Sequence, residues 1–236
     1  MPICQGKFEE AEIAFVGRFV KTGMTVLDIG AHHGLYTLLA SNRVGPQGRI
    51  FSFEPSTRER SALLQHIRMN RCKNVTVEVF AVGNENTDAQ LFVVEGAQTG
   101  CNSLRKPAPD VSGTLNPLTV HVVKLDDWLA SRKIDCVHFI KLDVEGGELE
   151  VLKGAHSLIS GNPRPIILVE VQDVRTLPWG YKGVEIIDYL KTKNYVWFGL
   201  RSNGSVEETN FASIEIEGNF VACPVESLAA LEPYKT

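Results

Sequence analysis

Two short segments of the sequence combine glycines with acidic residues, and such residues can take part in ligand binding and catalysis. "TVLDIGAHHG" brings Asp28, Gly30 and Gly34 together behind an apolar run, and "KLDVEG" brings Asp143 and Glu145 together in the same way. A glycine lets the backbone turn tightly and approach a ligand, because no Cβ intervenes. A carboxylate can act as a general base or bind a divalent cation through its oxygens. The two segments therefore predict a ligand site with acid–base chemistry beside it.

Both segments fall where strands should end, in a chain whose pattern alternates between strand and helix. Such alternation predicts a single α/β domain over 1–236, in which helices cover both faces of a mostly parallel sheet. We expect an N-terminal helical segment over 1–24 and a β-insertion over 84–124. The predicted strands are 25–30, 49–55, 74–83, 89–96, 118–125, 136–145, 165–172, 195–200 and 219–224, and the predicted helices are 8–20, 35–45, 56–70, 126–133 (capped by Asp126), 146–160 and 183–194.

Composition excludes several classes of protein. The net charge is −4, and no run of Lys or Arg is present, so nucleic acid is not expected as a partner. The five cysteines are scattered and form no CxxC pair, which favours reduced thiols over a disulfide framework. The first residues lack the pattern of a signal peptide, and no apolar run is long enough to span a membrane. We expect a cytoplasmic protein without membrane contact.

The first glycine loop favours a nucleoside cofactor with a cationic group. Dinucleotide folds usually carry G-x-G-x-x-G, whereas this loop reads D-x-G-x-x-x-G from Asp28 to Gly34. An aspartate so close to the ligand suits an ammonium group. Glu54 ends the next strand, where an acid can accept hydrogen bonds from two ribose hydroxyls. Together these residues indicate S-adenosylmethionine.

Three carboxylates are expected to converge beside the transferable methyl group. Asp143 and Glu145 follow a buried strand, and Glu170 ends its neighbour "IILVE". An alcohol needs a positioned base or a metal that acidifies it, so either one of these residues is the base, or several hold a divalent ion such as magnesium. Lys141 lies on the same face as Asp143, and an internal ion pair is favoured for it over a catalytic role.

At these residues the chain resembles the FkbM family of S-adenosylmethionine-dependent methyltransferases. The resemblance runs over about residues 6 to 172 and rests on "VLDIGAHHGLYTLLA", "GPQGRIFSFEP", "MNRCKNVTVEVFAVG", "VVKLDDWL" and "IKLDVEGGELEVLKGA". It implies a class I, Rossmann-like methyltransferase domain with a seven-stranded sheet. It also implies O-methylation of a small-molecule hydroxyl, in a sugar or another natural product.

The resemblance assigns roles to individual residues. Asp28, Gly30, Ala31 and Gly34 would surround the methionine part of the cofactor, Glu54 would hold the ribose, Ala81 and Val82 would lie near the adenine, and Ser103 would touch or cover the site. Pro55 and Asp143 are also expected among the cofactor-binding residues. The chain departs from the family at "GAHHG", where relatives often read "GANIG". His32 and His33 either fill this loop, or one of them serves as the base.

The sequence leaves three alternative functions open. The chain could bind the cofactor without catalysis, it could methylate nitrogen, or it could be a dehydrogenase. The fourth strand reads "DVEG" rather than the Asn/Asp-Pro-Pro-aromatic tetrapeptide of base-methylating enzymes, which disfavours the second. The long loop at 96–118 is expected to be a substrate lid. Neither the acceptor nor the oligomeric state follows from the sequence.

Overall fold

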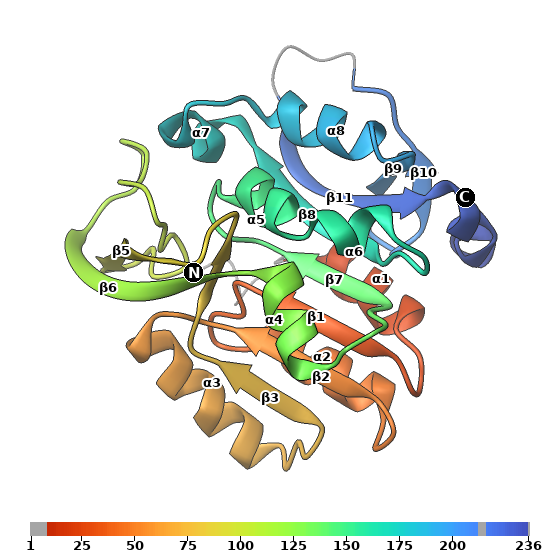
Figure 1. Cartoon of the computed structure of the whole chain (residues 1–236), viewed down its shortest axis with the longest axis horizontal. Helices are drawn as coiled ribbons and strands as arrows, with labels where there is room; N and C mark the ends of the chain where they lie inside the picture. Colours follow the sequence, from red (N-terminus) through yellow and green to blue (C-terminus); the bar gives the residue numbers. More distant parts are fainter. Residues whose placement is uncertain (1–8, 212–215, 236) are drawn as a thin grey trace.

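The computed structural model describes residues 9–211 and 216–235. Residues 1–8 of the predicted N-terminal segment lie outside the described residues. Within the described part of the chain, the main sheet has eight strands in the order β10-β9-β11-β8-β7-β1-β2-β3 (Figure 1). The strands are β1 Thr25–Ile29, β2 Arg49–Phe53, β3 Val75–Glu78, β7 Phe139–Leu142, β8 Ile166–Gln172, β9 Tyr195–Leu200, β10 Val206–Glu208 and β11 Glu217–Pro224.

The main sheet is mixed, which corrects the prediction of a mostly parallel seven-stranded sheet. The run β3-β2-β1-β7-β8 is parallel, whereas β11 is antiparallel to both β8 and β9, and β10 is antiparallel to β9. The chain passes from β9 to β10 through residues 201–205 without a crossover helix. Short connections of that kind permit only antiparallel pairing.

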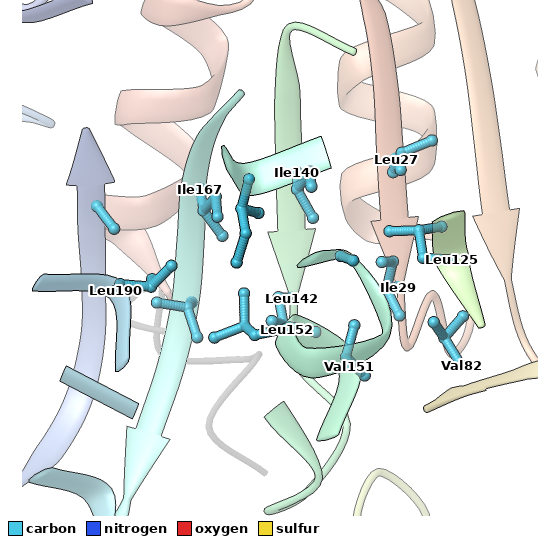
Figure 2. Packing of buried hydrophobic residues seen from close by; sticks show 14 of the residues in the cluster. Leu27, Ile29, Val82, Leu125, Ile140, Leu142, Val151, Leu152, Ile167 and Leu190 are labelled. Carbon is cyan, nitrogen blue, oxygen red and sulfur yellow. The ribbon is translucent and has the colours of Figure 1, made fainter. Parts of the chain in front are cut away.

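Helices cover both faces of this sheet, as expected (Figure 1). One core cluster joins β1, β7 and β8 to α4 (Leu125–Arg132), α5 (Glu148–Gly154), α6 (His156–Ser160) and α8 (Gly183–Lys191). Figure 2 shows part of it, with Ile140, Leu142 and Ile167 on the sheet facing Leu152 and its neighbours. The opposite face packs against α1 (Glu10–Phe19) and α2 (Leu35–Val44). The remaining helices are α3 (Thr57–Met69), α7 (Asp173–Thr176), η2 (Leu177–Trp179), η3 (Val225–Ala230) and η4 (Glu232–Tyr234).

A second, three-stranded sheet stands apart from the main one. It consists of β4 (Ala81–Gly83), β5 (Thr87–Glu95) and β6 (Thr114–Lys124) in the order β4-β6-β5. The predicted single strand 74–83 is therefore wrong. The chain leaves the edge of the main sheet after Glu78 and joins the second sheet at Ala81. The alternating pattern is the same in both sheets, so the break leaves no periodic signal.

Two local predictions were also wrong. Asp126 lies inside α4, whose N-cap is Lys124, and its carboxylate accepts hydrogen bonds from the backbone N–H groups of Ser157 (2.7 Å) and Leu158 (3.1 Å). It thus satisfies free amides at the start of a neighbouring helix. The predicted helix 146–160 is two helices, α5 and α6, which meet at Ala155.

Among the described residues, none of the helices combines the length and the apolar character needed to cross a membrane.

The contact between the two sheets predicts a sensitive position. A Cβ on Gly154, at the end of α5, would lie 1.9 Å from the carbonyl oxygen of Gly83 in β4. We expect Gly154→Ala to lower the free energy of unfolding by at least about 2 kcal/mol, because backbone must move to admit the methyl group. In the control Gly17→Ala, in α1, the nearest atom is 3.9 Å away. That change should be neutral or should stabilise by about 0.5–1 kcal/mol. Urea unfolding of both variants measures the difference, and equal midpoints would contradict the prediction.

Candidate functional site

A cavity of about 600 Å³ lies at the carboxyl ends of β1, β2 and β7. This is the edge where open α/β sheets bind ligands, and the volume is typical of a small-molecule site. Its wall is formed mainly by Ile29–Ala31, His32, His33, Leu35, Tyr36, Phe53–Pro55, Phe80–Val82, Leu91, Ala97–Leu104, Asp143–Glu145, Gly147, Glu170, Trp179 and Glu9.

The glycine loop after β1 packs directly against the turn after β7. Gly30 has a φ of 87°, and a Cβ there would lie 1.7 Å from the carbonyl oxygen of Asp143. Its N–H donates to the carbonyl of Phe53 at 3.1 Å, as does that of Ala31 at 3.0 Å. Gly34 has a φ of 90° and starts α2, where a Cβ would meet the side chain of Leu63 at 2.4 Å. Gly30 is therefore required by close approach to backbone as well as by conformation, and Gly34 is required by its conformation.

Glu54 stands at the floor of the cavity and holds this loop. Its Oε2 accepts a hydrogen bond from the N–H of His32, and its Oε1 accepts one from the N–H of Ser56, each at 2.8 Å. The residue is 5% exposed. Burial raises its pKa to about 7, although the two backbone N–H groups favour the ionised form. Each carboxylate oxygen retains a lone pair for a further donor.

Asp28 is placed differently from the expectation. It is 2% exposed in β1 and is absent from the cavity wall. Its Oδ2 accepts a hydrogen bond from Thr37 Oγ1 at 2.5 Å, and that hydroxyl also contacts Ser52 Oγ at 2.7 Å. Burial raises the pKa of Asp28 to about 6. The side chain thus fastens α2 to β1 and β2, and any effect on a ligand passes through the loop that follows.

Gly34, like Asp28, is absent from the cavity wall, whereas the other residues that the resemblance assigned to cofactor binding lie in it. Ala31 and Pro55 flank Glu54, and Ala81 with Val82 lies at the start of the second sheet. Ser103 is buried in the loop after β5, and its Oγ donates to the carbonyl of Glu145 at 2.9 Å.

The structure brings the three predicted carboxylates together. Asp143, Glu145 and Glu170 each offer an oxygen, and these atoms lie within 4.8 Å of one another. The route differs from the expected one, because β7 ends at Leu142 and Glu145 lies in a left-handed turn with a φ of 55°. Strand alternation therefore does not align Asp143 with Glu145; the turn does. Glu170 lies within β8 rather than at its end.

Lys141 forms the internal ion pair that the sequence predicted. Its Nζ lies 3.0 Å from Asp143 Oδ2 and 3.2 Å from Asn219 Oδ1, and the residue is 2% exposed. Burial alone would lower the pKa of Lys141, but the carboxylates of Asp143, Glu170 and Glu9 outweigh it and raise the pKa. Lys141 is thus a buried cation that offsets part of the negative charge of the cluster.

Burial and mutual repulsion raise the pKa values of two members of the cluster. Burial, then the charge of Asp143, raises the pKa of Glu145 to about 8, although Arg175 opposes the shift. The same two causes raise the pKa of Glu170 well above its ordinary value. Arg175 Nε lies 3.1 Å from Glu145 Oε2, which is an ion-pair distance, but the geometry is not that of a hydrogen bond. Oxygen donors this close match the ligands of a hard divalent cation, and they equally allow one carboxylate to take up a proton.

His32 and His33 stack on each other in the cavity wall, with ring centroids 3.8 Å apart. Burial and the neighbouring His33 lower the pKa of His32 to about 4, so its ring is neutral at pH 7. A ligand atom from each ring lies within 4.8 Å of Glu59, but Arg58 Nε donates to that carboxylate at 2.6 Å. Glu59 is thus already paired.

Sequence reasoning missed three residues of the site. Glu9 and Tyr36 line the cavity, and Tyr36 Oη donates to Glu9 Oε2 at 2.5 Å. Arg175 lies against Glu145 from α7. Glu9 precedes a helix and Arg175 falls in a short helix far from every motif, so no spacing pointed to either. Tyr36 stands two residues after Gly34, and that position alone could have indicated it.

The chain resembles proteins whose functions are named. Residues 28–197 match the family described as the methyltransferase FkbM domain. Methyltransferase 1 of Beauveria bassiana is 26% identical over 145 residues, which cover 55% of this chain and 57% of the relative. The 2-O-methyltransferase NoeI of Sinorhizobium fredii is 23% identical over 154 residues, which cover 59% of this chain and 60% of the relative. The chain thus spans less than two thirds of the length of these curated relatives.

A solved structure shares the fold. The FkbM methyltransferase of Methylobacillus flagellatus superposes with a TM-score of 0.54 at 18% identity, over 87% of this chain and 44% of that chain.

The carboxylate cluster makes stability depend on pH. The folded-state pKa of Glu170 is raised, whereas the unfolded value is about 4.3, so its contribution is complete below about pH 4.3 and is lost as the pH rises. Glu170→Gln keeps the shape and cannot ionise. We expect the variant to melt a few °C above the wild type at pH 8 and with a smaller gain at pH 5.

Calorimetric melting in buffer with a chelator measures this difference. The control is Glu208→Gln, which removes one exposed charge from β10 without touching the cluster. A gain at pH 8 that did not exceed that of the control would contradict the charge balance described for the cluster.

Proposed function

Because the chain belongs to the methyltransferase FkbM domain family, we propose that it transfers a methyl group from S-adenosylmethionine to a hydroxyl of a small molecule such as a sugar or another natural product. The observation that carries this proposal is the hydrogen bond from His32 N–H to Glu54. It places the glycine loop and the acid after β2 in one cavity, as a nucleoside cofactor requires.

The residues present fit S-adenosylmethionine. The close packing at Gly30 leaves no room for a Cβ, so backbone forms that part of the wall. Glu54 has two oxygens with spare lone pairs for ribose hydroxyls. Phe80, Ala81 and Val82 offer an apolar surface suited to adenine. Asp28 acts indirectly, because it holds α2 and the loop in place through Thr37.

The proposed chemistry needs a base beside the acceptor. Held by these residues, S-adenosylmethionine would supply an electrophilic methyl group for the acceptor oxygen, with S-adenosylhomocysteine as the leaving group. The hydroxyl proton passes to a carboxylate oxygen of the cluster. Asp143 suits this task best, because Lys141 lies 3.0 Å from its Oδ2 and pairs it as an anion. The pKa values of Glu145 and Glu170 are raised. At pH 7 these side chains can therefore either donate a hydrogen bond to the substrate hydroxyl or accept one from it.

A divalent metal is the less favoured role for the cluster. Lys141 and Arg175 already place positive charge beside Asp143 and Glu145. A magnesium ion would have to share that space with two cations. A carboxylate base therefore accounts for the arrangement without a third cation. The name of one relative, a 2-O-methyltransferase, is in keeping with oxygen rather than nitrogen as the acceptor atom.

Binding of S-adenosylhomocysteine tests the cofactor site. Burial raises the pKa of Glu54 to about 7, so the carboxylate that accepts two ribose hydroxyls is mostly protonated at pH 6 and mostly ionised at pH 8. We expect calorimetry to show affinity rising up to about tenfold from pH 6 to pH 8. Glu54→Gln should bind more weakly, and its affinity should change little over that range.

Four outcomes of this titration, repeated with NAD and with magnesium, would count against parts of the proposal. An unchanged pH dependence in Glu54→Gln would remove Glu54 from the ribose contact. Failure of the wild type to bind the nucleoside would contradict the cofactor itself, and binding of NAD instead would favour a dehydrogenase. Tighter binding in the presence of magnesium would favour a divalent metal at the carboxylate cluster over a carboxylate base.

Asp143→Asn separates binding from chemistry. We expect affinity for S-adenosylhomocysteine to stay within about threefold, because the change conserves shape, and turnover to fall about 10²–10⁴-fold, because the base is lost. Methyl uptake from labelled cofactor, screened over hydroxylated acceptors, measures turnover. Glu150→Gln is the control, since Glu150 lies in α5 outside the cavity wall and pairs with Lys153 at 2.8 Å. Normal turnover by Asp143→Asn would contradict the assignment of the base.

A further inference from the structure

The loop between β5 and β6, residues 96–113, covers one side of the cavity. Its first part, Ala97–Leu104, contributes to the wall. The loop is tied to itself near its two ends, because Gln98 Oε1 accepts hydrogen bonds from the N–H of Ser112 at 2.6 Å and from its Oγ at 3.0 Å. It is therefore a closed unit that lies across the site rather than a loose connector.

Three contacts fasten this loop to the opposite wall. Ser103 Oγ donates to the carbonyl of Glu145 at 2.9 Å, and the guanidinium carbon of Arg105 lies 4.9 Å from the ring centroid of Trp179. The third contact is an ion pair between Asp110 and Arg175, with 3.1 Å from Asp110 Oδ2 to Nη1. All three reach the turn after β7 or the segment after β8.

Arg175 is the point where the loop and the carboxylate cluster meet. One guanidinium pairs with Asp110 through Nη1 and lies 3.1 Å from Glu145 through Nε. The Arg175 and Glu145 side chains are 15% and 16% exposed, whereas that of Asp110 is 48% exposed. A planar guanidinium can serve two carboxylates at once through separate N–H groups. Movement of the loop away from Arg175 therefore changes the surroundings of Glu145 as well.

We propose that Arg175 is a positioning residue that couples closure of the 96–113 loop to the placement of Glu145. This inference rests on the proposed function, since it concerns the same cavity. With the Asp110–Arg175 pair formed, the loop seals the cavity and Glu145 has its cation. With the pair broken, the cavity opens on the side of Cys101–Leu104, and a bound nucleoside can leave more easily.

The experiment measures loop opening and ligand release separately. Trypsin cleavage after the exposed Arg105, identified by the mass of the fragment beginning at Lys106, reports opening of the loop without ligand. Stopped-flow dissociation of S-adenosylhomocysteine reports release. Both are measured on the full chain for wild type, Asp110→Asn, Arg175→Gln and the double variant. The control is Asp88→Asn, an exposed aspartate of β5 that pairs with His121 at 2.9 Å instead.

We expect Asp110→Asn and Arg175→Gln each to speed both cleavage and release at least threefold. The fold-change of the double variant relative to the wild type should be smaller than the product of the two single fold-changes. Asp88→Asn should match the wild type in both assays. Because Asp110 is half exposed, its substitution keeps the test valid if Arg175→Gln fails to fold.

The outcomes distinguish this inference from the proposed function. Wild-type rates of cleavage and release in Asp110→Asn would overturn the inference and leave the proposed function standing. Faster cleavage with unchanged release would also overturn it, because opening would then not reach the ligand. Failure of the wild-type chain to bind S-adenosylhomocysteine would overturn the proposed function, and the coupling with it.

Discussion

The close approach of Gly30 to the carbonyl of Asp143 is the constraint on which the site depends. The space that a Cβ would occupy is taken by that carbonyl oxygen. The same short segment receives the end of β2, since the N–H of Gly30 donates to Phe53, and supports β7, since the N–H of Asp143 donates to the carbonyl of Ile29 at 3.0 Å. Three strand ends therefore converge at one backbone contact. The proposed cofactor loop lies on one side of this contact, and the proposed base, Asp143, lies on the other.

The convergence has an electrostatic consequence. Carboxylates that would separate in water are held within 4.8 Å by β8 and by the turn after β7. Burial and like charge raise the pKa values of Glu145 and Glu170, and Lys141 supplies a buried compensating charge. Such an arrangement opposes folding as the pH rises, and groups of this kind concentrate at functional sites. Burial of the hydrophobic clusters on the two faces of the sheet stabilises the fold and offsets the cost of the buried carboxylates.

The sequence predicted what depends on local pattern and missed what depends on assembly. The α/β class and the central strands follow from periodicity. The meeting of Asp143, Glu145 and Glu170 was predicted from the rule that parallel strands end at one edge, but the turn after β7 brings Glu145 into it. The division of 74–83 between two sheets could not follow, because both sheets impose the same alternation. Asp28 was assigned to the ligand by its spacing, but its partner Thr37 is set by the packing of α2. Arg175 belongs to no motif and reaches Glu145 only through the fold.

The separate three-stranded sheet divides the chain into a part that is fixed and a part that is free to vary. The loop after β1 and the acid after β2 extend from the main sheet. The strands β5 and β6 attach through β4 and the contact at Gly154, and the 96–113 loop between them adds only its contacts with the turn after β7 and the segment after β8. A hairpin joined in this way can lengthen, shorten or exchange its tip without altering the register of a single strand in the main sheet. One scaffold could thus present different coverings over the same cavity. Insertions and deletions would then be expected in the β5–β6 hairpin, where they leave the main sheet intact.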